Sequence, residues 1–198
     1  AEPRAASRAL LSLALALGLG VGHHPSLIFI ALGWAVYLLL LDPSVLWQPR
    51  RWWKAVPVAA LAWALPQLYL PLRGANIEGL QLATPGLNTW AGFWHHVLAR
   101  GFSGDMFAFA NATDLSLRLP LLGPLFRFQF PLLALAGILA AWLWLLLSQR
   151  RATRQLALAL ALFVSWILHT FVTLTYRAPQ TVEYLMPAYL PMALVFGL

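Results

Sequence analysis

Residues 156–176 read LALALALFVSWILHTFVTLTY and decide the fold class, because these 21 consecutive residues include no charged side chain. A helix that crosses a membrane needs about 20 predominantly apolar residues. The whole chain has the same character, since 61% of its residues are hydrophobic and only 10% are charged. Soluble domains carry about 25% charged residues. The stretch therefore predicts a transmembrane helix in a membrane protein.

Five further apolar runs accompany this helix, at residues 9–22, 26–41, 55–72, 131–148 and 184–198. The first run is only about 21 Å long at a rise of 1.5 Å per residue, so it spans only with help from flanking residues. Pro57, Pro66 and Pro71 are expected to interrupt the third run. We therefore expect an all-α, polytopic membrane helix bundle of about six transmembrane helices, in a single domain over residues 1–198.

The basic residues predict how the chain is oriented. They lie in the N-terminal tail (Arg4, Arg8) and in the gaps 42–54 and 149–155, which separate apolar runs. If all three segments face the cytoplasm, the positive-inside rule is satisfied and the spans alternate without conflict. The turn 23–25, the long loop 73–130 and the gap 177–183 then lie on the exoplasmic face of a bacterial inner membrane.

The net charge of +7 is also explained by membrane topology, because the basic residues lie mainly in short gaps between apolar runs. That distribution is typical of topology signals and not of a nucleic-acid-binding patch, so no nucleic-acid partner is expected. The chain has no cysteine, which excludes disulfides and thiolate metal sites. No cofactor is predicted.

The exoplasmic loop 73–130 contains an amphipathic helix near residues 89–100. Its apolar face follows helical spacing and consists of Trp90, Phe93, Trp94, Val97 and Leu98. Asn88 is the expected N-cap and Gly101 the expected end. His95, His96 and Arg100 lie off this face. Such a helix should lie flat in the membrane interface.

A second apolar segment of the same loop covers residues 115–130. Pro120 and Pro124 are expected to break it. The segment then forms either a re-entrant piece or a second interfacial piece, and the sequence leaves both open.

The exoplasmic segments supply the candidate substrate-binding residues, which are His23, His24, Arg73, His95, His96, Arg177, Gln180 and Glu183. Ionisable groups at membrane depth are costly and tend to be functional, and a guanidinium suits bidentate contact with phosphate. A simpler interpretation makes the histidines contacts to lipid headgroups and Arg73 an interfacial anchor that snorkels. Glu183 enters an apolar helix and should have a partner, such as Arg73 or Arg177.

Metal and haem sites are disfavoured by the histidine pattern. Adjacent histidines rarely ligate one ion together, and the two His-His pairs lack the spacing of zinc helices, so no metal site is predicted. His169 lies inside the apolar run 156–176. A lone histidine in a membrane helix is more often hydrogen-bonded to a neighbouring helix than bound to haem or chlorophyll.

Four motifs carry a family resemblance. They are Gly-x-Gly-His-His-Pro at residues 20–25, Tyr-Leu-Pro-Leu-Arg at 69–73, the stretch Trp-x-x-Phe-Trp-His-His-Val-x-x-Arg-Gly-Phe-x-Gly-x-Met-Phe at 90–107, and Glu-Tyr-Leu-Met-Pro-Ala-Tyr-Leu at 183–190. In this order they resemble a bacterial multipass family with a domain of unknown function, related to protein O-mannosyltransferases. The resemblance covers most of the chain.

That resemblance implies the GT-C fold, in which exoplasmic loops form the active site. It also implies that a sugar is transferred from a lipid-linked, polyprenyl-phosphate donor to an acceptor, with membrane lipids around the site. Arg73 and Arg177 would stabilise the departing lipid phosphate, assisted by His23, His24 or His95.

One motif of that family is missing. Its members carry an acidic motif similar to Gly-Asp-Ser-Gly-Glu in an early exoplasmic loop, which supplies the catalytic carboxylate, whereas this sequence has none. Both ends of the sequence look internal, which predicts a longer protein with that motif upstream. The main alternative is a non-catalytic accessory subunit of a larger membrane assembly, such as a pigment–protein complex. A transporter or flippase would need charges along a pathway inside the spans.

Overall fold

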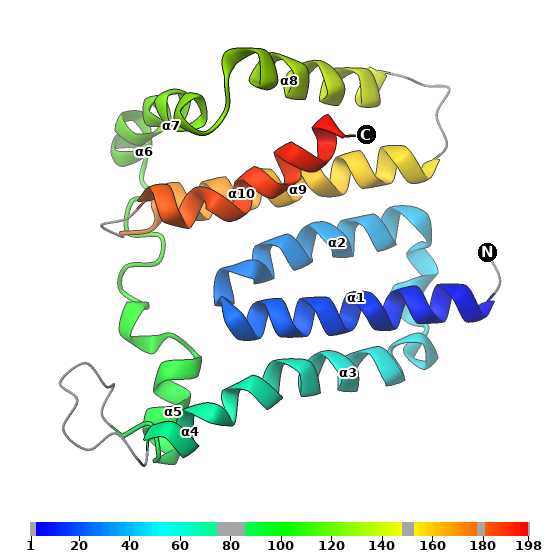
Figure 1. The fold of residues 1–198 in the computed structure, drawn as a ribbon, viewed down its shortest axis with the longest axis vertical. Helices are drawn as coiled ribbons and strands as arrows, with labels where there is room; N and C mark the ends of the chain where they lie inside the picture. Colours follow the sequence, from blue (N-terminus) through cyan, green and yellow to red (C-terminus); the bar gives the residue numbers. More distant parts are fainter. Residues whose placement is uncertain (1–2, 75–85, 148–152, 178–180, 198) are drawn as a thin grey trace. The chain divides into compact units, whose positions relative to one another are not determined.

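A computed structural model describes residues 3–74, 86–147, 153–177 and 181–197 (Figure 1). Every regular element in these ranges is a helix, which confirms the all-α prediction. The chain divides into two compact units that are interleaved in the sequence. Unit 1 comprises residues 1–28 and 47–103, and unit 2 comprises residues 29–46 and 104–198.

The elements of unit 1 are α1 (Pro3–His23), η1 (Pro25–Leu27), α3 (Pro49–Gln67), α4 (Tyr69–Gly74), α5 (Trp90–Val97) and η3 (Arg100–Phe102). Those of unit 2 include α2 (Ile28–Leu41), α6 (Ala112–Arg118), η4 (Leu119–Leu121), α7 (Leu122–Gln129), α8 (Leu132–Leu147), α9 (Thr153–Thr175) and α10 (Thr181–Phe196). The 3-10 turn η2 (Pro43–Trp47) ends where the chain returns to unit 1.

In unit 1, α1 and α3 pack side by side and run parallel (Figure 1). Gly18 faces Ala59 and Ala62, and one turn later Gly22 faces Trp63. A Cβ at Gly18 would overlap the Ala59 carbonyl oxygen and would lie 2.8 Å from the Ala62 Cβ. Small residues four apart allow membrane helices to approach this closely. The sequence contains this small-residue spacing but does not show which helix it meets.

The third predicted span is longer than expected, and Pro57 lies inside α3 without ending it. The run is interrupted at Leu68, because α3 ends at Gln67, directly after Pro66, and α4 begins at Tyr69. Pro49 begins α3 at a position where its missing N–H costs nothing, so Arg50, Arg51 and Lys54 belong to the helix. The helical stretch Pro49–Gly74 is continuous enough to count as one candidate span of 26 residues.

In unit 2, α2 runs antiparallel to α9. Phe29 contacts His169 edge-on with ring centroids 6.4 Å apart. Further along α2, Gly33 lies against Ser165, and a Cβ at Gly33 would lie 2.6 Å from the Ala161 carbonyl oxygen. The glycine therefore lets α2 approach the backbone of α9.

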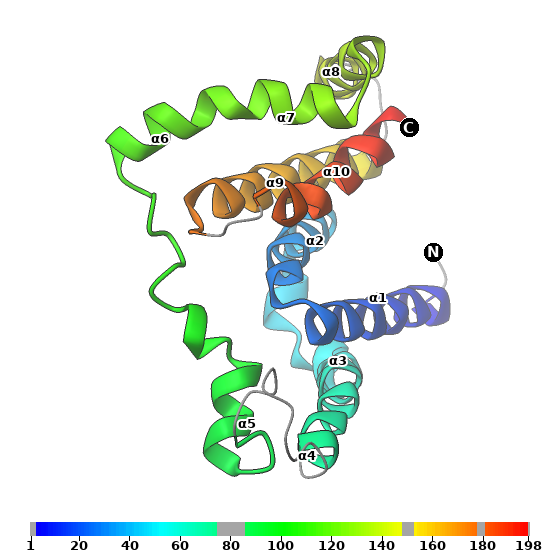
Figure 2. The same cartoon turned by 60° about the vertical axis from the view of Figure 1, so that its left-hand side comes forward.

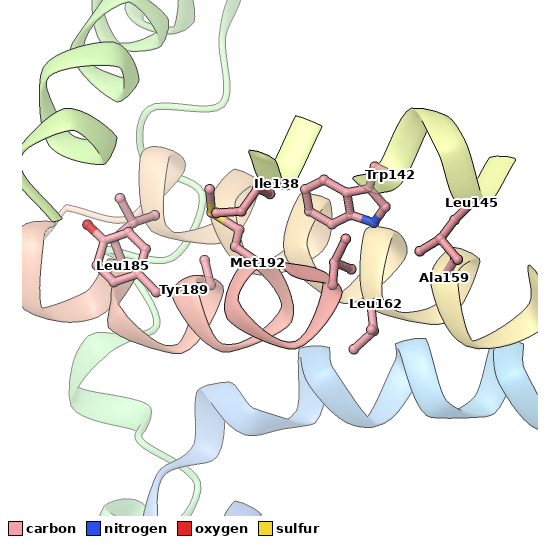
Figure 3. Packing of buried hydrophobic residues seen from close by; sticks show 10 residues of the cluster. Ile138, Trp142, Leu145, Ala159, Leu162, Leu185, Tyr189 and Met192 are labelled. Carbon is pink, nitrogen blue, oxygen red and sulfur yellow. The ribbon is translucent and has the colours of Figure 1, made fainter. Parts of the chain in front are cut away.

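The core of unit 2 joins α8, α9 and α10 (Figure 3). Leu145 of α8 lies beside Ala159 of α9, and Ile138 lies beside Met192 of α10. Ring contacts continue the cluster, because Trp142 lies 5.2 Å from Trp166 between ring centroids. Burial of such apolar and aromatic surface is the main source of packing between these three helices.

The buried polar groups of α9 bond to α10, as predicted for His169. Its Nε2 and the Thr173 hydroxyl each lie 3.0 Å from the Tyr184 carbonyl oxygen, which can only accept. Polar side chains of membrane helices commonly form such hydrogen bonds across to a neighbouring helix. The prediction that His169 bonds to a neighbouring helix is confirmed.

The segment 115–130 is broken at a different place than predicted. Pro120 and Pro124 each fall in the first turn of η4 or α7, where no N–H is needed, so the helical run continues from Ala112 to Gln129. The break comes at Phe130, whose backbone is extended (φ −126°, ψ 135°) because proline follows it. The run then meets α8 at 111° (Figure 2).

Length and composition make two described helices candidates to cross a membrane, Pro49–Gly74 and Arg154–Thr175. A third is counted if the bent pair α6–α7 and α8 forms one span. Shorter apolar helices cover Ser7–His23, Pro25–Leu41 and Val182–Phe196. These helices are compatible with a membrane protein, and the number of six spans stays a prediction.

Candidate functional site

In unit 1, several candidate residues gather at one end of the α1–α3 pair. His23 is the last residue of α1. The Gln67 amide nitrogen at the end of α3 donates to the Gly22 carbonyl oxygen over 2.6 Å, which joins the two helix ends. Since α4 follows α3 directly, its last-turn residue Arg73 belongs to the same end and is exposed.

His24 lies just beyond α1 in an extended conformation. The Ser26 hydroxyl donates to its Nδ1 over 2.7 Å, and the Ser26 backbone N–H lies 3.4 Å from the same atom. Partial burial lowers the pKa of His24 below its ordinary value, and the charge of neighbouring His23 acts in the same direction. His24 is therefore biased towards the neutral form, and His23 is exposed beside it.

The α5 helix is placed against this end by aromatic stacking. The Trp94 and Trp63 rings lie 6.2 Å apart at 23°. This leaves His95 and His96 exposed on α5. The predicted amphipathic helix thus exists over residues 90–97, with the predicted histidines outside its packed face, and its position in the membrane interface stays a prediction.

Both predicted ends of that helix are wrong by a residue or more. Thr89 is the N-cap instead of Asn88, because its hydroxyl accepts from the Gly92 N–H over 3.1 Å. The helix ends at Val97 instead of near Gly101, since Ala99 adopts a left-handed conformation with φ 49°. Trp90 is also largely exposed, so the packed face is narrower than its spacing predicts.

The electrostatic character of this end is cationic. Within the described residues of unit 1 there is no aspartate or glutamate. Arg73 and Arg100 provide positive charge, and the exposed His23, His95 and His96 offer ring nitrogens for hydrogen bonds. We call this group of residues, with His24, the cationic end of unit 1. Its composition suits an anionic group, such as a phosphate or a carboxylate, both of which arginine can bind with two hydrogen bonds.

In unit 2, the end of α9 is held by the segment that follows residue 104. The Phe109 N–H donates to the Thr175 carbonyl oxygen, and the Arg177 N–H donates to the Asp105 carbonyl oxygen, both over 3.0 Å. The Arg177 guanidinium also lies 3.8 Å from the Asp105 carboxylate. Asp105 is therefore a carboxylate partner of Arg177, and the pairing of Glu183 with Arg73 or Arg177 stays a prediction.

Arg118 is a structural residue that the sequence reasoning missed. Its Nε donates to the Leu174 carbonyl oxygen over 2.6 Å, and its guanidinium lies 4.3 Å from the centre of the Phe109 ring. Arg177 approaches the same ring at 5.7 Å. The sequence signal was present, because Arg118 occupies the packed face of the run that also carries Leu122 and Phe126.

Glu183 lies exposed in the first turn of α10. A carboxylate is favourable there because the helix N-terminus carries partial positive charge. Gln180 lies outside the described residues. The position of Glu183 thus has a local explanation that needs no arginine.

The predicted site residues are divided between the two units. Unit 1 holds His23, His24, Arg73, His95 and His96, and unit 2 holds Arg177 and Glu183. In the part of the chain that the structure describes, no group of three histidine or acidic side chains could hold a metal ion. No family model, curated protein or solved structure matches this chain.

Proposed function

We propose that this chain is a multi-pass protein of the bacterial inner membrane that binds a polyprenyl-phosphate-linked sugar at the exoplasmic face and takes part in its transfer. The observation that carries the proposal is the cationic end of unit 1. Two arginines and four histidines lie on the elements that form this end, and the described residues of unit 1 offer no carboxylate to neutralise them. The family resemblance supports the same function.

The chemistry of sugar transfer suits the cationic end of unit 1. When the bond from the sugar C1 to the phosphate oxygen breaks, negative charge grows on the lipid phosphate. Preorganised donors at that point lower the barrier, because they stabilise the charge that develops. Arg73 is suited to bidentate contact with the phosphate, and His23 or His95 can donate further hydrogen bonds.

The acceptor side of the reaction needs a different group. As the acceptor hydroxyl oxygen bonds to C1, its proton must pass to a general base, usually a carboxylate. We place this base outside the present sequence, in the acidic motif of the resembled family. Glu183 is a second choice for it.

The charges at the two ends of α3 support the exoplasmic orientation. Arg50, Arg51 and Lys54 lie in the first turns of α3, and Arg73 follows its far end. A cytoplasmic position for the first group satisfies the positive-inside rule. The cationic end of unit 1 then lies on the exoplasmic side, together with the phosphate of the donor.

The test is binding of a polyprenyl phosphate to the full-length protein in nanodiscs, with the corresponding polyprenol as the ligand that lacks phosphate. Arg73→Gln should weaken phosphate binding by about 10- to 100-fold, because a hydrogen bond to a charged group contributes about 1.5–3 kcal/mol. Arg8→Gln is the matched control, since Arg8 is exposed near the opposite end of α1. Equal binding of phosphate and polyprenol, or equal losses in both variants, would contradict the proposal.

A non-catalytic accessory subunit is the second candidate. The lack of a described carboxylate in unit 1 favours it, because sugar transfer then needs a group supplied by another chain. The intact mass of the native protein distinguishes the two candidates. A much larger chain with an acidic exoplasmic motif upstream supports the transferase. A mass near 21.9 kDa supports the accessory subunit.

A further inference from the structure

The helical run formed by α6, η4 and α7 has an exposed apolar stripe. Leu122, Leu125 and Phe126 on its inner side pack against the core of unit 2. On its outer surface Leu117, Leu121 and Phe128 are 68%, 53% and 81% exposed. At about 100° per residue in α6 and α7 and about 120° per residue in the 3-10 turn, these three side chains and Pro124 lie within an arc of roughly 80°. We call these four residues the apolar stripe.

A second flank of the same run is polar or small. Ser116, Gly123 and Arg127 are exposed and lie within an arc of roughly 80°, centred about 100° from the apolar stripe. A Cβ at Gly123 would meet no atom within 4 Å, which confirms that this flank is open. Leu119, which belongs to the same 3-10 turn as Leu121, is also exposed but lies off the stripe. The run therefore has three sides, which are a packed side, an apolar flank and a polar flank.

The direction of the run follows from its junction with α8. The two helices meet at 111°, so the run lies about 20° from the plane perpendicular to α8. The α8 helix is apolar throughout and packs on α9, one of the two candidate spans (Figure 2). If α8 and α9 cross the bilayer, the run from Ala112 to Gln129 lies close to the membrane plane.

We propose that α6–α7 lies in the membrane interface, with the apolar stripe in the lipid and the flank of Ser116, Gly123 and Arg127 in water. The lipid around α8 continues up to α7, since only Phe130 and Pro131 separate the two helices. A spanning or re-entrant position would place the guanidinium of Arg127 in hydrocarbon, which is costly. The division into an apolar and a charged flank is typical of helices that lie in the interface. This proposal does not depend on sugar transfer.

Depth measurements on single-cysteine variants test the proposal, because these 198 residues contain no cysteine. Leu117→Cys, Leu121→Cys and Phe128→Cys report on the apolar stripe. Ser116→Cys, Gly123→Cys and Arg127→Cys report on the polar flank. Each full-length variant carries a nitroxide in phospholipid vesicles, and its accessibility to oxygen and to a water-soluble nickel complex gives its depth. All six positions are exposed, so the variants should unfold at the same temperature as the wild-type protein.

We expect the stripe labels to lie about 5–10 Å deeper than the flank labels, the scale set by the diameter of a helix with its side chains. Depth should alternate with the helical period from residue 116 to residue 128. A depth that increases steadily along the run would overturn the proposal in favour of a spanning or re-entrant helix. If the nickel complex reached the labels on both flanks, the run would lie in water and the proposal would be overturned. If the labels on both flanks were protected from oxygen and from nickel, another protein would cover the run, which would also overturn the proposal.

Discussion

Replacing Gly18 by alanine should separate α1 from α3. A Cβ at this position would overlap the Ala59 carbonyl oxygen and approach the Ala62 Cβ to 2.8 Å, whereas Cβ contacts below 3.0 Å are essentially never found. Both neighbours are rigid, one being backbone and the other a Cβ atom. The helices must therefore move apart, and a gap of about 0.5–1 Å already forfeits a quarter to a half of each dispersion contact across the interface.

The magnitude follows from comparison with Gly20→Ala in the same helix. A Cβ at Gly20 would meet only the end of the flexible Leu27 side chain, at 3.3 Å. Both substitutions gain about 0.5–1 kcal/mol from the higher helix propensity of alanine. Gly18→Ala additionally carries an overpacking cost of about 1–3 kcal/mol. Gly18→Ala should therefore be less stable than Gly20→Ala by about 1–3 kcal/mol.

Thermal unfolding of the purified protein in detergent measures this difference. For a chain of 198 residues, 1 kcal/mol shifts Tm by about 2–4 °C, so Gly18→Ala should melt roughly 2–12 °C below Gly20→Ala. Equal Tm values for the two variants would refute the close contact between α1 and α3. A Gly20→Ala variant that is the less stable of the two would refute it as well.

Two further predictions concern Arg118 in unit 2 and His24 in unit 1. Arg118→Ala should destabilise the protein by about 1.5–3 kcal/mol, because the carbonyl of the buried residue Leu174 loses a charged donor. The control is Arg127→Ala, an exposed position that should change the free energy of unfolding by less than about 0.5 kcal/mol. Equal effects of the two substitutions in unfolding experiments would contradict the role of Arg118. The lowered pKa of folded His24 means that the unfolded chain takes up its proton first as the pH falls below about 6.5. His24 therefore contributes stability above that pH which is lost in acid, and His24→Gln should reduce the fall in Tm between pH 8 and pH 5. An unchanged slope in the variant would show that other groups titrate.

The sequence predicted the helices well because apolar length is a local property. The runs 26–41 and 131–148 appear as Ile28–Leu41 and Leu132–Leu147, within two residues at each end. The run 156–176 appears as Thr153–Thr175. Such boundaries depend on residues that are neighbours in the chain.

Errors arose where proline position or a distant partner decides the outcome. Pro120 and Pro124 were expected to break a helix, yet each occupies a first turn, and the break lies before Pro131. The cap at Thr89 depends on which of two adjacent polar residues adopts the extended conformation. Spacing cannot distinguish these cases.

The candidate site was predictable only as a set of residue types. The sequence places His23, Arg73 and His95 on one face of the membrane if the topology holds. It could not show that Gln67 joins the ends of α1 and α3, nor that Asp105 is the partner of Arg177. Both contacts join residues that are far apart in the chain and depend on how the helices pack.

The interleaving of the two units has a consequence for synthesis in the cell. The α2 helix emerges from the ribosome between α1 and α3, but its partner α9 comes much later. The Ser165 hydroxyl that approaches the Ile30 carbonyl is 135 residues downstream. At about 5–20 residues per second, α2 waits roughly 7–27 s for this neighbour. During that interval Gly33 has not yet met Ala161 and Ser165, so this face of α2 lacks the neighbour that it has in the folded protein.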